Sequence, residues 1–166
     1  MSAVPRTQPS CLLPMATSHL DTVMDIEAQA YAFPWSRGNF VDSLASGYAA
    51  RVLYGDDGAI VGYFVAMAGV DEMHLLNITV APSRQHRGHA RCMLDALVVL
   101  CRERGAGQLW LEVRESNARA RAIYLRRGFV QVGVRKGYYP APEGRREDAV
   151  VMSLAINASE VRDGLD

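Results

Sequence analysis

Residues 75–94 constrain the fold of this 166-residue chain more than any other segment. An apolar strand ends at Val80, Pro82 stops it, and a short basic turn leads into a helix with one apolar face. The turn and the helix N-terminus point several backbone N–H groups at one spot, with arginines nearby. Gly88 lets the backbone of the turn approach a ligand closely. The segment therefore predicts a site for a phosphate or pyrophosphate.

The composition is that of an ordinary soluble domain, with 49% apolar and 22% charged residues. Eighteen basic and eighteen acidic residues cancel, which argues against general affinity for nucleic acid or for a membrane surface. The longest apolar run, residues 59–70, is too short to span a membrane. We expect one domain over residues 10–157, flanked by flexible tails at 1–9 and 158–166.

The three cysteines do not suggest a disulfide framework or a metal site. Cys92 and Cys101 lie nine residues apart on one predicted helix, too far along its axis to be bridged, and Cys11 belongs to a predicted early strand. His86 and His89 lack a third ligand at a sensible spacing, so we expect no metal. A reduced, cytoplasmic protein is the natural interpretation.

Apolar periodicity predicts an α/β protein with a mixed sheet. Further strands are expected over residues 49–54, 59–70, 74–80, 108–114, 129–135 and 147–156. Helices are expected over 19–30, over 37–45 with Ser36 as N-cap, from 90 to a cap at Gly105, and over 117–127 with Gly128 beyond its end. Residues 138–140 are predicted as a loop. Hairpins first and strand–helix alternation later place helices on both faces of the sheet.

Motifs in this order and spacing resemble those of the GNAT N-acetyltransferase superfamily. The turn carries the Q-x-x-G-x-A pattern of residues 85–90, and later matches are LWLEVR at 109–114, SN at 116–117, AIY at 122–124 and GF at 128–129. Four further motifs are similar to those of the bacterial ribosomal-protein-alanine N-acetyltransferases: AFPWS at 32–36, NITV at 77–80, YYP at 138–140 and REDA at 146–149. The resemblance covers about residues 10–157, and it implies a mostly antiparallel sheet.

The resemblance implies acetyl-CoA as co-substrate. Its pyrophosphate would lie on the turn, and its pantetheine arm would pair with the strand before the turn. The residues implied are Ile78, Thr79, Val80, Gln85, His86, Arg87, Gly88, His89, Ala90, Arg91 and Asn117. His89 departs from the family, which usually has an aliphatic residue there. The alternative is an ordinary strand-to-helix turn with solvated arginines.

Glu112 is the candidate general base. Alternation places it on the face of the strand opposite Leu109, Leu111 and Val113, and a carboxylate in so apolar a strand is costly unless it is paired or useful. An α-amine loses only about 1 kcal/mol to protonation at pH 7, against roughly 4.6 kcal/mol for a lysine. A glutamate can therefore suffice for an α-amine acceptor. The alternative is a structural ion pair of Glu112 with an arginine, Arg114 or Arg91.

Tyr124 is the candidate general acid by resemblance, because the departing thiolate needs a proton. The alternative is a core tyrosine packed against Phe129. The acceptor peptide would lie between the 33–36 and 138–140 segments, and an acidic residue would attract a basic peptide. The implied acceptor-binding residues are Phe33, Trp35, Glu72, Tyr138 and Tyr139.

These residues together predict an N-terminal protein acetyltransferase. It would acetylate the α-amine of the N-terminal alanine of a small-subunit ribosomal protein by direct attack in a ternary complex, with no membrane partner and no direct nucleic-acid recognition. Two alternatives remain open. One is the same fold acting on a lysine side chain or a small-molecule amine, and the other is a non-catalytic acyl-CoA-binding module.

Overall fold

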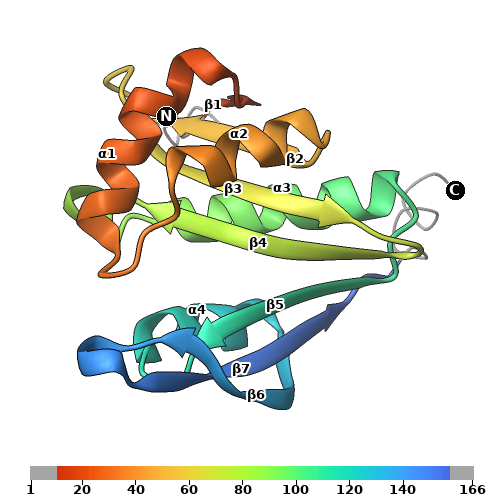
Figure 1. The fold of residues 1–166 in the computed structure, drawn as a ribbon. Helices are drawn as coiled ribbons and strands as arrows, with labels where there is room; N and C mark the ends of the chain where they lie inside the picture. The colour runs from red at the N-terminus through yellow and green to blue at the C-terminus, as the bar shows by residue number, and fades with distance from the viewer. Residues whose placement is uncertain (1–10, 158–166) are drawn as a thin grey trace, which may run out of the picture. The chain divides into compact units, whose positions relative to one another are not determined.

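A computed structural model of the chain describes residues 11–157 (Figure 1). Both predicted tails, 1–9 and 158–166, lie outside these residues. The strands are β1 (Cys11–Pro14), β2 (Ala49–Tyr54), β3 (Ile60–Ala68), β4 (Glu72–Val80), β5 (Gln108–Arg114), β6 (Val130–Pro140) and β7 (Arg146–Ala155). The helices are α1 (Leu20–Ala30), α2 (Arg37–Ala45), α3 (His89–Glu103) and α4 (Ala118–Arg127), with short 3-10 turns η1 (Thr17–His19), η2 (Pro82–Arg84) and η3 (Pro142–Gly144).

Within this part of the chain the strands form one seven-stranded sheet in the order β1-β2-β3-β4-β5-β7-β6. The β4–β5 pair is parallel, and the β1–β2, β5–β7 and β6–β7 pairs are antiparallel. The predicted mixed α/β class is therefore confirmed, and so is the early strand at Cys11. Across residues 11–157 the helices are all too short or too polar to cross a membrane.

The chain divides into two compact units, which we describe separately. Among the described residues, the first comprises those from Cys11 to Val65 together with Asn77–Met93, and the second comprises Ala66–Leu76 together with those from Leu94 to Asn157. The first unit thus contains β1, β2, β3 up to Val65, α1, α2, the end of β4, the turn into α3 and the start of that helix. The second contains the start of β4, the rest of α3, and all of β5, α4, β6 and β7.

Adjacent residues of β3 contact helices on opposite faces in the first unit. Tyr63 is fully buried, and its ring lies 5.7 Å from that of Phe40 on α2. The neighbouring Gly62 faces α3, where a Cβ atom would lie 3.0 Å from Met93 Cε and 2.7 Å from the carbonyl oxygen of Thr79. Helices therefore cover both faces of β3, as the sequence predicted.

The second unit is built on the predicted alternation of β5. Leu109, Leu111 and Val113 are buried on one face, whereas Trp110 and Glu112 lie half-buried on the other. β7 pairs with β5 along one edge and with β6 along the other, and β6 and β7 form the longest hairpin of the described chain. The candidate base, Glu112, thus lies on β5 in a stretch that pairs with β7.

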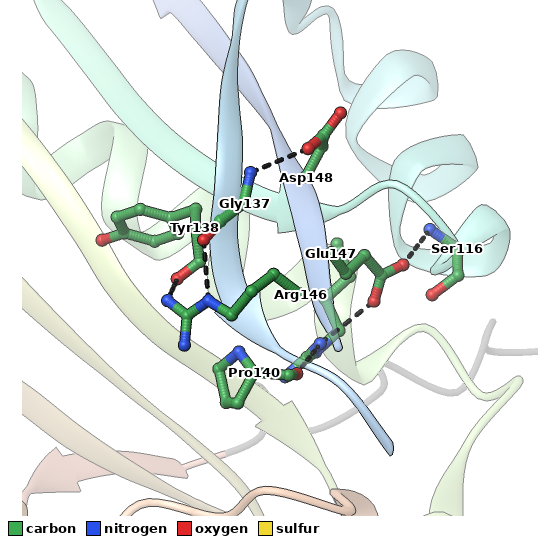
Figure 2. A network of polar contacts seen from close by, with 8 residues as sticks. Ser116, Gly137, Tyr138, Pro140, Arg146, Glu147 and Asp148 are labelled. Atoms are coloured by element: carbon green, nitrogen blue, oxygen red, sulfur yellow. Dashed lines mark hydrogen bonds and ion pairs between the residues drawn. The ribbon is translucent and has the colours of Figure 1, made fainter. Parts of the chain in front are cut away.

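Two predicted boundaries are wrong. Residues 138–140 are not a loop, because β6 continues to Pro140 through a register shift between Arg135 and Tyr139. Side chains of β7 satisfy the backbone groups of this irregular stretch: Arg146 donates to the carbonyls of Gly137 and Tyr138 at 2.9 and 3.1 Å (Figure 2). The strand predicted over 59–70 ends at Ala68, where a tight turn begins.

Candidate active site

The turn into α3 has the backbone of an anion site. His86 and Gly88 both have positive φ, at 65° and 81°, which bends the chain sharply before the helix. A Cβ atom at Gly88 would meet nothing within 4 Å, so the glycine is required by its left-handed conformation and not by crowding. The Gly88 carbonyl accepts the N–H of Cys92 at 3.0 Å in the first turn of α3. The bend thus leads directly into a helix N-terminus, as predicted.

The side chains of this turn differ in their availability for an anion. Arg84 is engaged by Asp57, with 2.6 Å between guanidinium and carboxylate. Burial, and then the positive charge of Arg87, lower the pKa of His89, so its imidazole is neutral at pH 7. The positive charge of the turn therefore comes from arginines. Within residues 11–157 the acidic, cysteine and histidine side chains form no group of three suited to a metal ion.

Buried and half-buried residues alternate along the end of β4, which belongs to the first unit. Asn77 and Thr79 are buried, whereas Ile78 and Val80 are half-buried. The hydroxyl of Tyr31, at the end of α1, donates to the Ile78 carbonyl at 3.1 Å and lies 2.7 Å from Thr79 Oγ1.

A buried carboxylate that the sequence analysis missed lies in the same unit. Glu27 of α1 is 1% exposed. Its Oε1 accepts from Tyr63 at 2.6 Å and from Asn77 at 3.0 Å, and its Oε2 accepts the backbone N–H of Trp35 at 2.8 Å. Burial, and then the Glu27 charge, raise the pKa of Tyr63, so the phenol stays protonated as a donor.

The Glu27 network connects α1 to the predicted acceptor segment 33–36. The indole ring of Trp35 packs on Phe40, with 5.1 Å between ring centroids, while Phe33 is 42% exposed. The predicted N-cap is confirmed, since Ser36 Oγ accepts the N–H of Asn39 at 3.1 Å. One signal was available in the sequence: Glu27 falls at position i+7 from Leu20, on the apolar face of α1.

Glu112, in the second unit, contacts a histidine and an arginine that the sequence analysis did not name. Its side chain is 9% exposed, with Oε2 at 2.5 Å from His74 Nε2 and Oε1 at 3.4 Å from Arg135 Nε. Arg114 instead lies 3.0 Å from Glu147. A histidine of β4 and an arginine of β6 thus lie against the Glu112 carboxylate, and neither was among the arginines that the alternative named.

Tyr124 lies on α4, in surroundings that fit a packed core tyrosine as well as a general acid. It is 9% exposed, and its ring lies 5.7 Å from that of Phe129. Asn117 is the N-cap of the same helix, its Oδ1 accepting the N–H of Ala120 at 3.2 Å. Packing of the Tyr124 ring is compatible with a reactive hydroxyl.

The two tyrosines of the YYP motif lie under arginines at the end of β6. The guanidinium of Arg114 is 4.6 Å from the Tyr139 ring centroid, and that of Arg135 is 5.5 Å from the Tyr138 ring centroid. Burial, and then the charge of Glu112, raise the pKa of Tyr139. Tyr139 therefore stays a neutral phenol close enough to Glu112 to sense its charge.

Glu72 lies apart from this group within the second unit. It stands opposite Gln108 at the start of the parallel β4–β5 pair. Gln108 precedes Glu112 by four residues on β5. Four residues of a strand span roughly 13 Å. A role for Glu72 in acceptor binding thus stays a prediction, and it would concern a more distant part of the peptide.

Comparison with known proteins gives consistent matches. Residues 20–129 match the model of the acetyltransferase (GNAT) family. The chain is 38% identical over 143 residues to the ribosomal protein bS18-alanine N-acetyltransferase of Escherichia coli (strain K12), covering 86% of this chain and 95% of that protein. The corresponding enzyme of Haemophilus ducreyi is 38% identical over 134 residues, covering 81% and 92%. The crystal structure of the Escherichia coli ribosomal-protein-S18-alanine N-acetyltransferase matches with a TM-score of 0.81 and 36% identity, covering 89% of this chain and 94% of that one.

Proposed function

The chain belongs to the acetyltransferase (GNAT) family, and on that premise we propose that it transfers the acetyl group of acetyl-CoA to the α-amine of the N-terminal alanine of ribosomal protein bS18. The observation that carries the proposal is the 38% identity spanning 95% of the Escherichia coli bS18-alanine N-acetyltransferase. The match thus spans nearly the whole of that enzyme and is not confined to part of its fold. The resemblance inferred from the sequence motifs is thereby confirmed at the level of the family.

Acetyl-CoA would be held by the turn and by the end of β4. The bent backbone at His86 and Gly88, followed by a helix N-terminus, suits a pyrophosphate, and Arg87 and Arg91 supply positive charge. The remaining proposed contacts are Gln85, His89 and Ala90 in the turn, the backbone of Ile78, Thr79 and Val80, and Asn117. When bound, acetyl-CoA supplies an activated thioester.

Glu112 would act as the base. The acceptor α-ammonium must lose a proton before its nitrogen attacks, and the largely buried carboxylate on β5 can accept that proton. Tyr124 would protonate the departing thiolate from α4. Direct transfer needs no nucleophile of the enzyme, so the free thiols of Cys92 and Cys101 have no part in the proposed reaction.

Two aromatic segments would contact the acceptor peptide. Phe33 and Trp35 lie in the segment anchored by Glu27, and Tyr138 and Tyr139 lie under arginines at the end of β6. We place the reaction in the cytoplasm, where ribosomal proteins are synthesised.

The test is thiol release from acetyl-CoA with two peptides that share the N-terminal sequence of bS18. One peptide has a free N-terminal alanine, and the other has a blocked N-terminus and an intact lysine. We expect release with the free peptide alone. Release with the blocked peptide alone would reassign the activity to lysine side chains, and binding of acetyl-CoA without release from either peptide would favour a binding module or another amine.

A further inference from the structure

A continuous series of hydrogen bonds runs from the buried Glu27 to the end of β4. Asn77 Nδ2 donates to Glu27 Oε1 at 3.0 Å, and Thr79 Oγ1 donates to Asn77 Oδ1 at 2.7 Å. The hydroxyl of Tyr31 lies 2.7 Å from Thr79 Oγ1 and 3.1 Å from the Ile78 carbonyl oxygen. The series thus ends on the backbone of a residue that is proposed to hold acetyl-CoA.

The direction of each hydrogen bond follows from the donors that these side chains carry. The amide nitrogen of Asn77 faces Glu27, so the amide oxygen, which only accepts, faces Thr79. Thr79 has one hydroxyl proton and gives it to that oxygen, so Tyr31 is the donor toward Thr79. Burial raises the pKa of Tyr31 to about 12, which keeps this donor protonated at neutral pH. Tyr31 therefore shares one proton between Thr79 Oγ1 and the Ile78 carbonyl.

The Ile78 carbonyl lies on the edge of β4 that faces away from β3. The N–H of Ala81, just after β4, donates to the Val61 carbonyl of β3 at 2.8 Å. Successive residues of a strand direct their backbone groups to opposite edges, so the carbonyls of Ile78 and Val80 point to the other edge. Within the described chain the β4–β5 ladder covers Glu72 to Leu75, and the end of β4 lies beyond it. Tyr31 therefore supports the strand at an edge that this ladder does not hold.

We propose that Tyr31 is a positioning residue for acetyl-CoA, because its hydroxyl fixes the Ile78–Thr79 peptide at the edge where the pantetheine arm would pair; this inference rests on the function proposed above. The carbonyl of Ile78 and the N–H of Thr79 belong to one planar peptide group, so a bond to the carbonyl holds the whole plane. Tyr31 acts through the strand and takes no part in the chemistry of transfer.

Pre-organisation of the strand is the means by which Tyr31 would change the affinity for acetyl-CoA. A ligand that binds one arrangement of a strand has an apparent Kd equal to its intrinsic Kd divided by the fraction of protein in that arrangement. One hydrogen bond is strong enough to change such a fraction several-fold. Loss of the Tyr31 hydroxyl should therefore weaken binding while the backbone groups that pair with the ligand all remain.

The proposed acceptor segment depends on the same carboxylate through its other oxygen. Glu27 Oε2 accepts the N–H of Trp35 at 2.8 Å, whereas Asn77 and Tyr63 donate to Oε1. Tyr31→Phe leaves the bond to Trp35 in place and removes only the last link of the series. We therefore expect its effect on acetyl-CoA and not on the acceptor peptide, whereas a general loss of stability would affect both substrates.

The decisive variant is Tyr31→Phe, which keeps the ring and removes the hydroxyl. We expect the Kd for coenzyme A, measured by calorimetry, and the KM for acetyl-CoA to rise about three- to tenfold. The KM for the peptide, and kcat at saturating acetyl-CoA, should stay within about twofold of the wild type. Tyr63→Phe is the matched control. It removes a phenol hydroxyl that donates to Glu27 at the other end of the series, so it should keep the wild-type affinity for coenzyme A.

Wild-type affinity for coenzyme A in Tyr31→Phe would overturn the inference, and so would an equal loss of affinity in both variants. A second readout needs no ligand. The NMR resonance of the Ile78 carbonyl carbon should shift in Tyr31→Phe and stay in place in Tyr63→Phe, and an unmoved resonance in Tyr31→Phe would overturn the contact. If the wild-type protein acetylates neither peptide, the proposed function fails by itself, and the affinities for coenzyme A still decide the role of Tyr31.

Discussion

The Tyr63 hydroxyl donates to Glu27 Oε1 at 2.6 Å in the interior of the first unit. Glu27 accepts two further bonds, from Asn77 and from the Trp35 backbone, so three donors from different parts of the sequence converge on one carboxylate. A buried charge is tolerated only when it is bonded in this way. Glu27 therefore ties the segment before α2 to the end of β4.

Removal of this carboxylate should destabilise the protein severely. Glu27→Ala leaves three donors without an acceptor, and we expect a loss of about 3 kcal/mol or more in the free energy of unfolding. Tyr63→Phe removes a single bond to a charged group and keeps the ring beside Phe40, so about 2 kcal/mol is expected. Urea denaturation measures both values. A loss below about 1 kcal/mol in Glu27→Ala would contradict the network.

Glu112→Gln should separate chemistry from binding. The amide keeps the size of the side chain but does not accept the proton of the amine, so we expect kcat to fall about 100-fold or more. Binding of acetyl-CoA, measured by calorimetry, should be nearly unchanged. Normal kcat at neutral pH would remove Glu112 from the role of base.

Tyr124→Phe tests the acid in the same assay. The phenylalanine ring keeps its packing against Phe129, so the stability should change little while kcat falls about 10- to 100-fold. The measurement pairs initial rates with a thermal unfolding midpoint. Unchanged turnover would assign Tyr124 to the core alone.

Gly88→Ala tests the backbone of the proposed phosphate turn. Gly88 has φ of +81° in open space, so alanine adds backbone strain of about 1 kcal/mol without a clash. Gly144, with φ of +71° and equally open surroundings, is the matched control. Both variants should lose similar stability, but only Gly88→Ala should weaken coenzyme A binding, by up to about tenfold. Equal affinity in the two variants would argue against pyrophosphate binding at the turn.

Glu147 should make the stability depend on acid pH. Hydrogen bonds from Ser116, and then Arg114, hold the pKa of Glu147 below its usual value of 4.5 (Figure 2). A carboxyl group with a lowered folded-state pKa stabilises the protein above that usual value, and the contribution is lost as the pH falls through the folded value. Glu147→Gln should therefore be less stable than the wild type at pH 7, and the difference should close below pH 4.5. Unfolding midpoints across this range measure it, with Glu143→Gln as the charge-matched control.

The sequence predicted those features that depend on neighbours along the chain. The cap at Ser36, the left-handed ends at Gly105 and Gly128, and the alternation around Glu112 follow from local periodicity and turn chemistry. The same local signals placed the bend before α3. Because these local signals fixed the helices and strands, the family motifs could be assigned to the elements on which they lie.

The missed features depend on contacts between distant segments. His74 reaches Glu112 only because the β4–β5 register sets it opposite Trp110, and the sequence does not give that register. The Glu27 network joins residues up to 50 positions apart. The strand at 138–140 escaped prediction because Arg146 of the next strand supplies the bonds that its irregular backbone needs.

The close approach at Gly62 limits how this protein can diverge. Its φ lies outside the left-handed region, so it is the 2.7 Å clearance from the Thr79 carbonyl to a Cβ atom that excludes every other residue. The close spacing of β3, β4 and the first turn of α3 thus requires that the residue at position 62 has no side chain. New acceptor preferences can arise in the aromatic segments, because their mutations leave that spacing untouched.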